Sequence, residues 1–207
     1  MDKLIIIGTG GLARELTCWC QGHFQVVGYS SLDAGEHTAF RLPCPLYPDE
    51  ITPGLVGTDK ALIAISSPVL KERIFNRLAQ AGFVFPTFVH PSALVADSAM
   101  LGEGVVVSPN CVLGSNVRVG RSAYLNFAVG LGHDADIGDF VQINPGVQVG
   151  GWVKIGRGTL IGSNASLIER LTVGEHVTIA SGAACFGSIR DSATVMGNPA
   201  RRMRAFE

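Results

Sequence analysis

The residues in this chain with the most obvious capacity for chemistry are His133 and Asp134, in the segment Leu131-Gly132-His133-Asp134-Ala135. An imidazole titrates near neutral pH and can take a proton from a reacting amine or hydroxyl. Gly151 follows His133 by eighteen residues, and a glycine N–H is not shielded by a side chain. If the chain brings these two positions together, the imidazole, the carboxylate and the N–H form a set that could carry out acyl transfer.

The residue types alone leave a second interpretation open, in which His133 is a solvated corner histidine without a chemical role. Asn126 lies seven residues before His133, and Asn144 follows Asn126 by eighteen. Such asparagines often do no more than satisfy backbone groups between neighbouring turns of a repetitive fold. We interpret His176 as a solvated corner residue.

The elements that must position these groups are indicated by a six-residue period. An apolar residue, aliphatic in all repeats before the last, recurs without a break through sixteen repeats from Val95 to Cys185, and a smaller apolar residue follows nearly every one by four positions, ending at Ile189. Glycine follows the aliphatic residue in most repeats, as at Gly102, Gly120 and Gly138. The pattern predicts a solenoid with a flat inward-facing strand and a tight corner in every repeat.

Three such strands close one coil of eighteen residues, so that residues eighteen apart stack about 4.7–4.9 Å from each other. This register is what would place Gly151 one coil beyond His133 in the same column. We expect the large aliphatic side chains to fill the interior. We also expect the glycine to accommodate unusual backbone angles at the corner.

The N-terminal part has a different pattern, in which strands alternate with helices. Strands are predicted at 4–8, 25–29 and 61–66, and helices at 12–21 and 69–81. This order is typical of a small parallel α/β sheet. We therefore expect a Rossmann-like α/β domain over residues 1–85, a proline-marked linker over 86–94, and an all-β parallel β-helix over 95–207.

Composition excludes several classes of protein. The formal net charge is −1 and 47% of residues are hydrophobic, which disfavours disorder and gives no general attraction to nucleic acid or to an anionic membrane. No apolar run reaches the roughly 20 residues of a membrane span, and no signal peptide is evident. Five cysteines without a C-x-x-C pair favour a reducing cytoplasm over a disulfide framework.

The whole chain resembles the sialic-acid O-acetyltransferase and bacillosamine-pathway sugar N-acetyltransferase family. These are hexapeptide-repeat acyltransferases with an N-terminal Rossmann-like domain. The matching segments span both halves: Lys3–Gly11, His90-Pro91-Ser92-Ala93, Asn126 seven residues before His133-Asp134, and Gly197-Asn198-Pro199-Ala200. The resemblance implies a left-handed β-helix, acetyl-CoA as co-substrate, no metal, and a homotrimer with active sites shared between subunits.

By the same resemblance His133 is the general base, Asn126 and Asp134 are candidates to orient it, and the Gly151 N–H polarises the acetyl carbonyl. Relatives often carry an acidic residue immediately before this histidine, where the chain has Gly132, so Asp134 is the expected carboxylate partner. The carbonic-anhydrase-like relatives of this solenoid use three zinc-binding histidines. The repeats here contain only His133 and His176, which disfavours a zinc-dependent hydratase.

The glycine-rich turn at the start of the chain is the expected site for the diphosphate of a nucleotide-linked sugar, because such turns let a phosphate approach a helix N-terminus. It lacks the G-x-G-x-x-G spacing of redox dinucleotide sites. Leu12 stands where relatives have histidine or phenylalanine, and Ser30-Ser31 stand where relatives have an acidic pair. The nucleotide is therefore left open. The predicted substrate-binding residues are Gly8, Thr9, Gly10, Gly11, Leu12, Ser30 and Ser31.

Coenzyme A phosphates call for basic residues near the C-terminal motif. The predicted acetyl-CoA-binding residues are Gly151, Lys154, Asn198, Pro199 and Arg201, and Arg157, Arg202 and Arg204 are further candidates.

We therefore expect a cytoplasmic, acetyl-CoA-dependent N-acetyltransferase acting on a nucleotide-linked amino sugar, such as a 4-amino-4,6-dideoxy hexose, for surface glycan biosynthesis. One alternative is O-acetylation of a sialic acid or another sugar hydroxyl. A second is a non-catalytic trimeric scaffold that binds sugar nucleotides.

Overall fold

The computed structural model describes residues 1–203 and divides into two compact units, with the boundary between Pro86 and Thr87. Residues 87–94, which make up most of the segment expected to be a linker, already belong to the second unit. Strand β5 (Phe88–Val89) pairs with β8 (Val106–Val107), and β6 (Leu94–Val95) pairs with β9 (Val112–Leu113). Prolines suppress helix in this segment but leave extended chain available, and the sheet edges of the next coil accept it.

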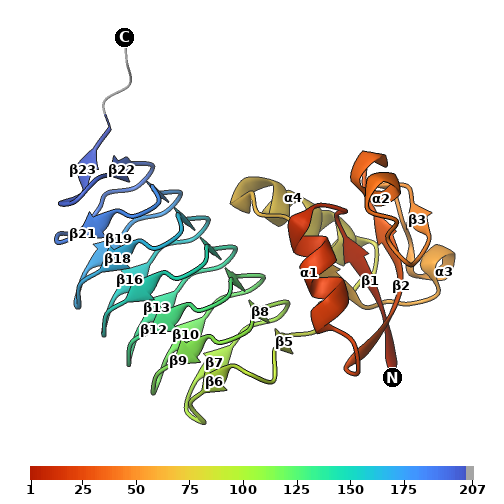
Figure 1. Ribbon diagram of the computed structural model, residues 1–207, viewed down its shortest axis with the longest axis horizontal. Helices are drawn as coiled ribbons and strands as arrows, with labels where there is room; N and C mark the ends of the chain where they lie inside the picture. Colours follow the sequence, from red (N-terminus) through yellow and green to blue (C-terminus); the bar gives the residue numbers. More distant parts are fainter. Residues whose placement is uncertain (204–207) are drawn as a thin grey trace. The chain divides into compact units, whose positions relative to one another are not determined.

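The first unit is a parallel sheet of strand order β3-β2-β1-β4, which confirms the predicted α/β character (Figure 1). The central strand β1 is apolar over Leu4–Ile7 and completely buried there, as expected for a parallel strand covered on both faces. Its elements are β1 (Asp2–Ile7), α1 (Gly11–Trp19), β2 (Phe24–Ser30), α2 (Gly35–Ala39), β3 (Leu46–Tyr47), α3 (Pro53–Val56), β4 (Ala61–Ile63) and α4 (Pro68–Gln80).

The predicted strands and helices of this unit are found within a few residues of their expected bounds. Helix α4 begins at Pro68, and the hydroxyl of Ser67 accepts a hydrogen bond from the N–H of Leu70 at 3.4 Å, a capping arrangement that also suits proline in the first turn. The sequence patterns missed α2, β3 and α3. These elements are two to five residues long and carry too few apolar positions to show a period.

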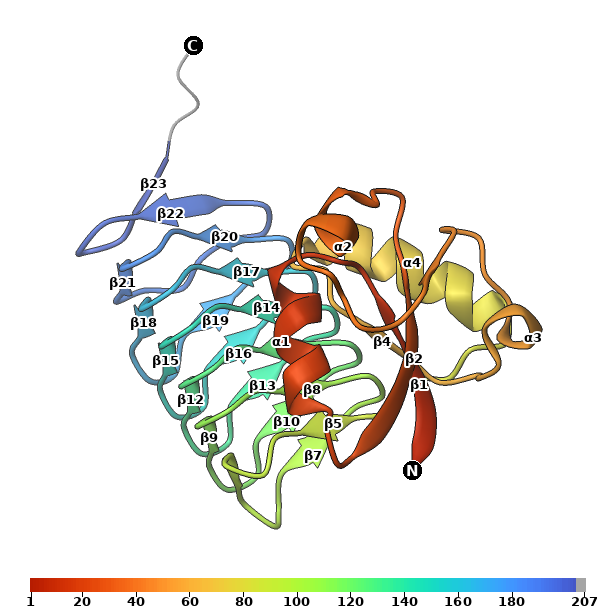
Figure 2. The same ribbon diagram turned by 45° about the vertical axis from the view of Figure 1, so that its right-hand side comes forward.

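The second unit is a parallel β-helix, drawn as stacked triangular coils in Figures 1 and 2. Its strands form sheets of order β19-β16-β13-β10-β7, β23-β22-β20-β17-β14-β11-β8-β5 and β21-β18-β15-β12-β9-β6. The remaining strands are β7 (Met100–Leu101), β10 (Arg118–Val119), β11 (Tyr124–Leu125), β12 (Gly130–Leu131), β13 (Asp136–Ile137), β14 (Gln142–Ile143), β15 (Gln148–Val149), β16 (Lys154–Ile155), β17 (Leu160–Ile161), β18 (Ser166–Leu167), β19 (Thr172–Val173), β20 (Thr178–Ile179), β21 (Ala184–Cys185), β22 (Thr194–Met196) and β23 (Arg201–Arg202).

The eighteen-residue register is confirmed: Leu125 pairs with Ile143, and Leu131 with Val149. The large aliphatic residue is the second residue of each short strand and points inward. It meets the smaller apolar series in one continuous core, which includes Val107, Ile143 and Ile179. Burying one such aliphatic side chain contributes roughly 1.5–3 kcal/mol to stability. The long core therefore stabilises every coil through its two neighbours.

The expectation that the repeat glycines accommodate unusual backbone angles was wrong. Gly102, Gly120 and Gly138 do not have positive φ; a Cβ at Gly120 would lie 2.6 Å from the backbone nitrogen of Asp139 in the next coil. These glycines are required because adjacent coils approach closely. The left-handed conformation occurs two residues further on, for example at Asn116 with φ of 59°. Asparagine and glycine tolerate it better than other residue types.

The last coil departs from the period. Strand β22 pairs with β20 at a spacing of sixteen residues, Thr178 with Thr194, and Ile189 forms a bridge with Val173. Ile189 was expected in the series of smaller corner residues. It lies instead at a strand position, because this coil is two residues shorter than the others.

Candidate functional site

His133 lies at the corner that follows β12, and Gly151 lies at the same corner one coil further along. The N–H of Trp152 donates to the carbonyl of His133 at 3.0 Å, and the N–H of Arg170 donates to the carbonyl of Gly151 at 2.9 Å. Each of these bonds spans nineteen residues. Together they tie successive corners into a rigid ladder that supports the His133 side chain.

The imidazole of His133 is held by its neighbour in sequence. Its Nδ1 donates to Oδ2 of Asp134 at 2.9 Å, and the other carboxylate oxygen accepts from Nδ2 of Asn116 at 3.1 Å. The hydrogen bonds from His133 and Asn116 lower the pKa of Asp134 from its ordinary value of 3.8, so the carboxylate is ionised at neutral pH. An ionised carboxylate can only accept, so in the neutral imidazole the proton lies on Nδ1 and the Nε2 lone pair is free.

Gly151 is in contact with this imidazole. A Cβ at position 151 would lie 2.9 Å from both Cε1 and Nε2 of His133, so only glycine fits without moving the ring. Within the described residues 1–203 the Gly151 N–H donates no hydrogen bond to another protein group. The structure therefore brings the Nε2 edge of the imidazole against Gly151, whose N–H is not used within the described residues, and acyl transfer requires a base nitrogen and an N–H donor of this kind.

Two residues at this corner were not anticipated from the sequence. The indole of Trp152 makes a T-shaped contact with the His133 ring, with centroids 4.3 Å apart and an interplanar angle of 89°. The guanidinium of Arg170 lies over the indole, 4.0 Å from its ring centroid. The same eighteen-residue stacking that relates His133 to Gly151 also relates Asp134, Trp152 and Arg170. Counting by eighteen along the sequence could therefore have predicted that these three residues lie in one column.

Asn126, predicted to orient His133, lies elsewhere. It follows β11 and therefore occupies a different corner of the triangular coil from His133, which follows β12. Asn126 is 6% exposed, and its Oδ1 accepts from the N–H of Phe127 at 2.8 Å. Within this chain the structure does not bring Asn126 to His133.

Lys154, predicted to bind coenzyme A, lies beside the Asp134 face of the corner. A groove of about 420 Å³ is lined by Lys154, Arg118, Asn116, Asp134 and Asp136, together with Ser98, Met100 and Ala135. The basic side chains of Lys154 and Arg118 are matched in this groove by the carboxylates of Asp134 and Asp136, so the groove has no excess of positive charge.

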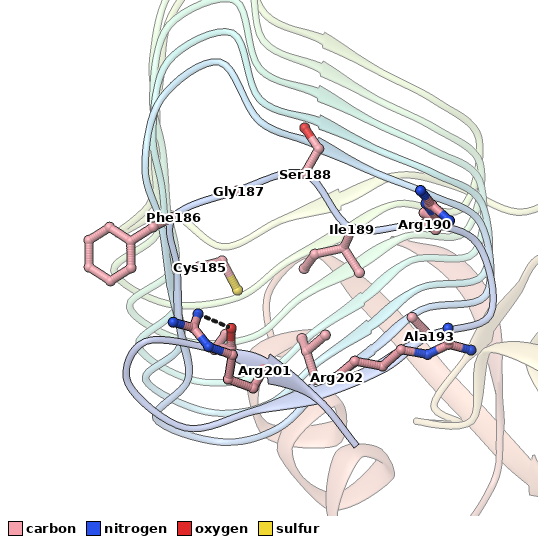
Figure 3. Close-up of a pocket in the computed structure, with 11 residues that line it drawn as sticks. Cys185, Phe186, Gly187, Ser188, Ile189, Arg190, Ala193, Arg201 and Arg202 are labelled. Carbon is pink, nitrogen blue, oxygen red and sulfur yellow. Dashed lines mark hydrogen bonds between the residues drawn. The ribbon is translucent and has the colours of Figure 1, made fainter. Parts of the chain in front are cut away.

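Arg201 lies at the end of the solenoid, in a cavity of about 490 Å³ shown in Figure 3. Arg190 and Arg202 line the same cavity, whose floor includes Cys185, Ile189 and Val195. Asn198 and Pro199, joined by a cis peptide bond, lie in the turn that leads from β22 into β23. The candidate Arg204 falls outside the described residues.

The first unit has a cavity of about 440 Å³ at the carboxyl end of its sheet. Three of the predicted substrate-binding residues, Gly8, Ser30 and Ser31, line it, with Leu32, Asp33 and Arg73 among the others. Gly10, Gly11 and Leu12 do not line it; they begin helix α1, and the Thr9 hydroxyl donates to the carbonyl of Asp33 at 3.3 Å. Gly8 has φ of 111°, which favours glycine where the chain turns away from β1.

The charge of this cavity is set by helix α4. Arg77 forms a two-pronged ion pair with Asp49, including a 2.8 Å bond from Nη2 to Oδ1, and this pair lowers the pKa of Asp49. Arg73 lines the same cavity, and its positive charge also helps to lower the pKa of Asp49, although no hydrogen bond or ion pair of its side chain is found within residues 1–203. The Ser30 hydroxyl donates to the carbonyl of Pro48 at 2.7 Å, so the Arg73 guanidinium and the Ser31 hydroxyl are the groups at this end of the sheet that suit a phosphorylated ligand.

Two further observations concern residues 1–203. No group of three or more His, Cys, Asp or Glu side chains is placed to hold a metal ion. None of the helices is long and apolar enough to cross a membrane.

Comparison with known families identifies the repeat. The model of the bacterial transferase hexapeptide (six repeats) matches residues 134–169, which lie in the central coils and include Asp134 and Gly151. No curated protein sequence matches the chain.

Solved structures match the chain over nearly its full length. A variant of perosamine N-acetyltransferase from Caulobacter crescentus, in complex with CoA and GDP-perosamine, is 23% identical with a TM-score of 0.89, over 99% of this chain and 98% of that one. The acetyltransferase domain of PglB from Neisseria gonorrhoeae is 27% identical with a TM-score of 0.86, and the match covers 98% of this chain and 100% of that one. The structure of that domain in complex with acetyl coenzyme A matches with a TM-score of 0.72 at the same identity, and the match covers 98% of this chain and 99% of that one.

The hexapeptide family, the coil register and the likeness across both units confirm the predicted fold class, a Rossmann-like α/β unit followed by a left-handed parallel β-helix. They also confirm the enzyme class expected from the sequence. The chain is a hexapeptide-repeat acetyltransferase, and over both units it is similar to sugar N-acetyltransferases such as the PglB acetyltransferase domain.

Proposed function

We propose that this protein transfers the acetyl group of acetyl-CoA to the amino group of a nucleotide-linked amino sugar, such as a 4-amino-4,6-dideoxy hexose, in surface glycan biosynthesis. The observation that carries the proposal is the corner at His133, where a base with a defined tautomer contacts Gly151. The similar structures that contain CoA with GDP-perosamine, or acetyl coenzyme A, support the choice of donor and of acceptor class.

In this mechanism Nε2 of His133 removes a proton from the acceptor amine as its nitrogen bonds to the thioester carbonyl carbon. The Gly151 N–H donates to the carbonyl oxygen as negative charge develops there. The carbon–sulfur bond then breaks, and the proton held by His133 passes to the leaving thiolate. The products are an amide and free CoA. Asp134 stabilises the imidazolium that forms and keeps the ring oriented.

The donor would lie along the second unit. We propose that Gly151 and Lys154 contact acetyl-CoA near the thioester, and that Asn198, Pro199 and Arg201 contact it near the end of the solenoid. Arg201, Arg202 and Arg190 line one cavity there, which suits a phosphorylated group.

The acceptor's nucleotide would be held in the first unit, with its diphosphate near Gly8, Ser30 and Ser31 and with Arg73 as the counter-charge. Thr9 supports this loop through its bond to Asp33. We assign Gly10, Gly11 and Leu12 the role of starting helix α1, whose N-terminus favours an anion.

We further propose a cytoplasmic homotrimer. Asn126 lies at a different corner from His133, so it could reach a His133 only across an interface between subunits. The free cysteines among the described residues suit a reducing compartment. Light scattering on the purified protein tests the trimer: a monomeric mass would leave Asn126 without a part in the site.

The decisive experiment measures acetyl transfer by the purified enzyme with amino-sugar and hydroxyl-sugar nucleotides, comparing wild type, His133→Ala and His176→Ala. We expect amine acceptors to be used, His133→Ala to lose about 10²–10⁴-fold in kcat, and His176→Ala to keep it. Preference for a hydroxyl acceptor would indicate the O-acetyltransferase alternative. Activity above a tenth of wild type in His133→Ala would exclude the general-base role, and no transfer by wild type would favour the scaffold. A metal analysis of the same preparation tests the hydratase alternative.

A thermal-shift screen of UDP-, GDP-, dTDP- and CMP-sugars identifies the nucleotide. A ligand at 100 times its dissociation constant adds about 2.7 kcal/mol to stability. The nucleotide that binds should do so in His133→Ala as well, since the cavity lies in the first unit.

A further inference from the structure

We propose that Trp152, backed by Arg170, is a positioning residue that holds the imidazole of His133 in its reactive orientation. The inference rests on the proposed function of His133 as the base. It extends that function to two residues that share no hydrogen bond with the imidazole and act through ring contacts.

The contacts around His133 leave one direction of motion to be restrained. Asp134 holds Nδ1, and Gly151 limits the ring along its Cε1 and Nε2 edge. The His133 side chain is nevertheless 51% exposed. Solvent on the remaining sides does not fix the orientation of the ring, so a further protein contact is needed there. The indole of Trp152 is perpendicular to the imidazole, with ring centroids 4.3 Å apart, and this contact restricts the motion of the imidazole.

The backbone conformation of Trp152 is shared by the equivalent corners of other repeats. Trp152 has φ of 55°, and Arg170 and His176 have φ of 63° and 53°. The left-handed backbone is therefore a property of the corner, and the position of the Trp152 ring must be explained by its side-chain contacts.

Burial does not account for Trp152, which is 42% exposed. Its ring is fixed instead by two specific contacts, with His133 on one side and the Arg170 guanidinium 4.0 Å from its centroid. The backbone bond from the Trp152 N–H to the His133 carbonyl ties the two residues together as well. These contacts make the orientation of the indole and that of the imidazole depend on each other.

The test uses Trp152→Asn, Trp152→Phe and Arg170→Met in the full-length enzyme. Asparagine suits the left-handed backbone, so Trp152→Asn removes the ring without adding strain. We expect its melting temperature to be unchanged or raised, its kcat to fall about tenfold or more, and its KM values to stay within about threefold, because a displaced base slows the chemical step. Trp152→Phe should restore most of kcat, and Arg170→Met should lie between wild type and Trp152→Asn.

Two measurements separate positioning from other roles. Nitrogen-15 NMR of the His133 imidazole in the absence of substrates should show one tautomer in wild type and averaging in Trp152→Asn. The pH profile of kcat should also shift in the variant. Phe40→Asn is the matched control, since it removes an exposed ring under Arg14 in the first unit, and it should leave both readouts unchanged.

The outcomes are distinguishable. An unchanged kcat and imidazole spectrum in Trp152→Asn would overturn the inference, as would a large rise in KM with an unchanged spectrum, which would make Trp152 a substrate contact. If His133→Ala remains active, the proposed function of His133 fails first; the substrate-free spectrum still decides whether Trp152 orients the ring.

Discussion

The α-carbon of Gly151 lies against the imidazole of His133, so closely that a Cβ at position 151 would come within 2.9 Å of Cε1 and Nε2. Eighteen residues separate the two, the length of one coil. Because both sit at the same corner of successive coils, the geometry of the base is set by the backbone register of the solenoid. The candidate site is therefore as rigid as the ladder that carries it.

Gly151→Ala should displace the His133 ring and reduce kcat by about 10²-fold, since a misplacement of about 1 Å can have an effect of that size. Steady-state kinetics with a saturating acceptor measure it. Gly54→Ala is the control, because a Cβ there meets nothing within 4 Å. Near-normal kcat in Gly151→Ala would show that the contact is not needed for the reaction.

Asp134→Asn keeps the shape of the side chain and suits the backbone φ of 59°, but removes its charge. We expect a fall in kcat of at least tenfold, because the imidazolium loses its counter-ion. Since the pKa of Asp134 is lowered in the folded protein, its contribution to stability is present above pH 3.8 and is lost as the pH falls further. Melting temperatures at successive pH values should therefore decline less steeply below that pH in the variant. Equal declines would contradict the assigned hydrogen bonds.

Arg73→Ala should weaken binding of the nucleotide sugar and leave the chemical step intact. Arg77 is committed to Asp49, whereas Arg73 is the guanidinium available to a phosphate in the cavity of the first unit. We expect KM for the sugar nucleotide to rise about tenfold with little change in kcat, which corresponds to losing about 1.4 kcal/mol of uniform binding. The KM for acetyl-CoA is the internal control. A drop in kcat without a change in KM would place Arg73 in a different role.

Ile143→Ala should destabilise the β-helix by about 2–5 kcal/mol, since the side chain is completely buried in a central coil. Denaturant unfolding followed by circular dichroism measures this loss. Thr178→Ala, on an outward-facing strand position, should change the free energy of unfolding by less than about 1 kcal/mol. Comparable losses in the two variants would mean that the core does not carry the stability of the unit.

Part of the candidate site was accessible from the sequence because it repeats the period of the fold. The pairing of His133 with Gly151 follows from counting one coil, and the bond from His133 to Asp134 joins adjacent residues. Trp152 and Arg170 belong to the same columns and could have been found by counting onward from Asp134. The catalytic roles of these residues remain predictions.

Asn126 shows where counting along the chain is insufficient. A spacing of seven residues moves the chain to another corner of the coil, so Asn126 and His133 are separated within this chain even though they are close in sequence. In the first unit, the cavity residues Asp49, Arg73 and Arg77 come from segments that no local pattern links to the glycine-rich turn.

The sequence by itself determined the coil length, the inward-facing residues and the corner that carries His133, because a six-residue hydrophobic period admits one register with a continuous core. It also determined the alternation of strands and helices in the first unit. Only the tertiary structure decided that the repeat glycines serve close approach between coils and that the last coil is short. It alone decided which side chains enclose the imidazole. These features depend on distances between atoms of neighbouring coils, which a one-dimensional pattern does not contain.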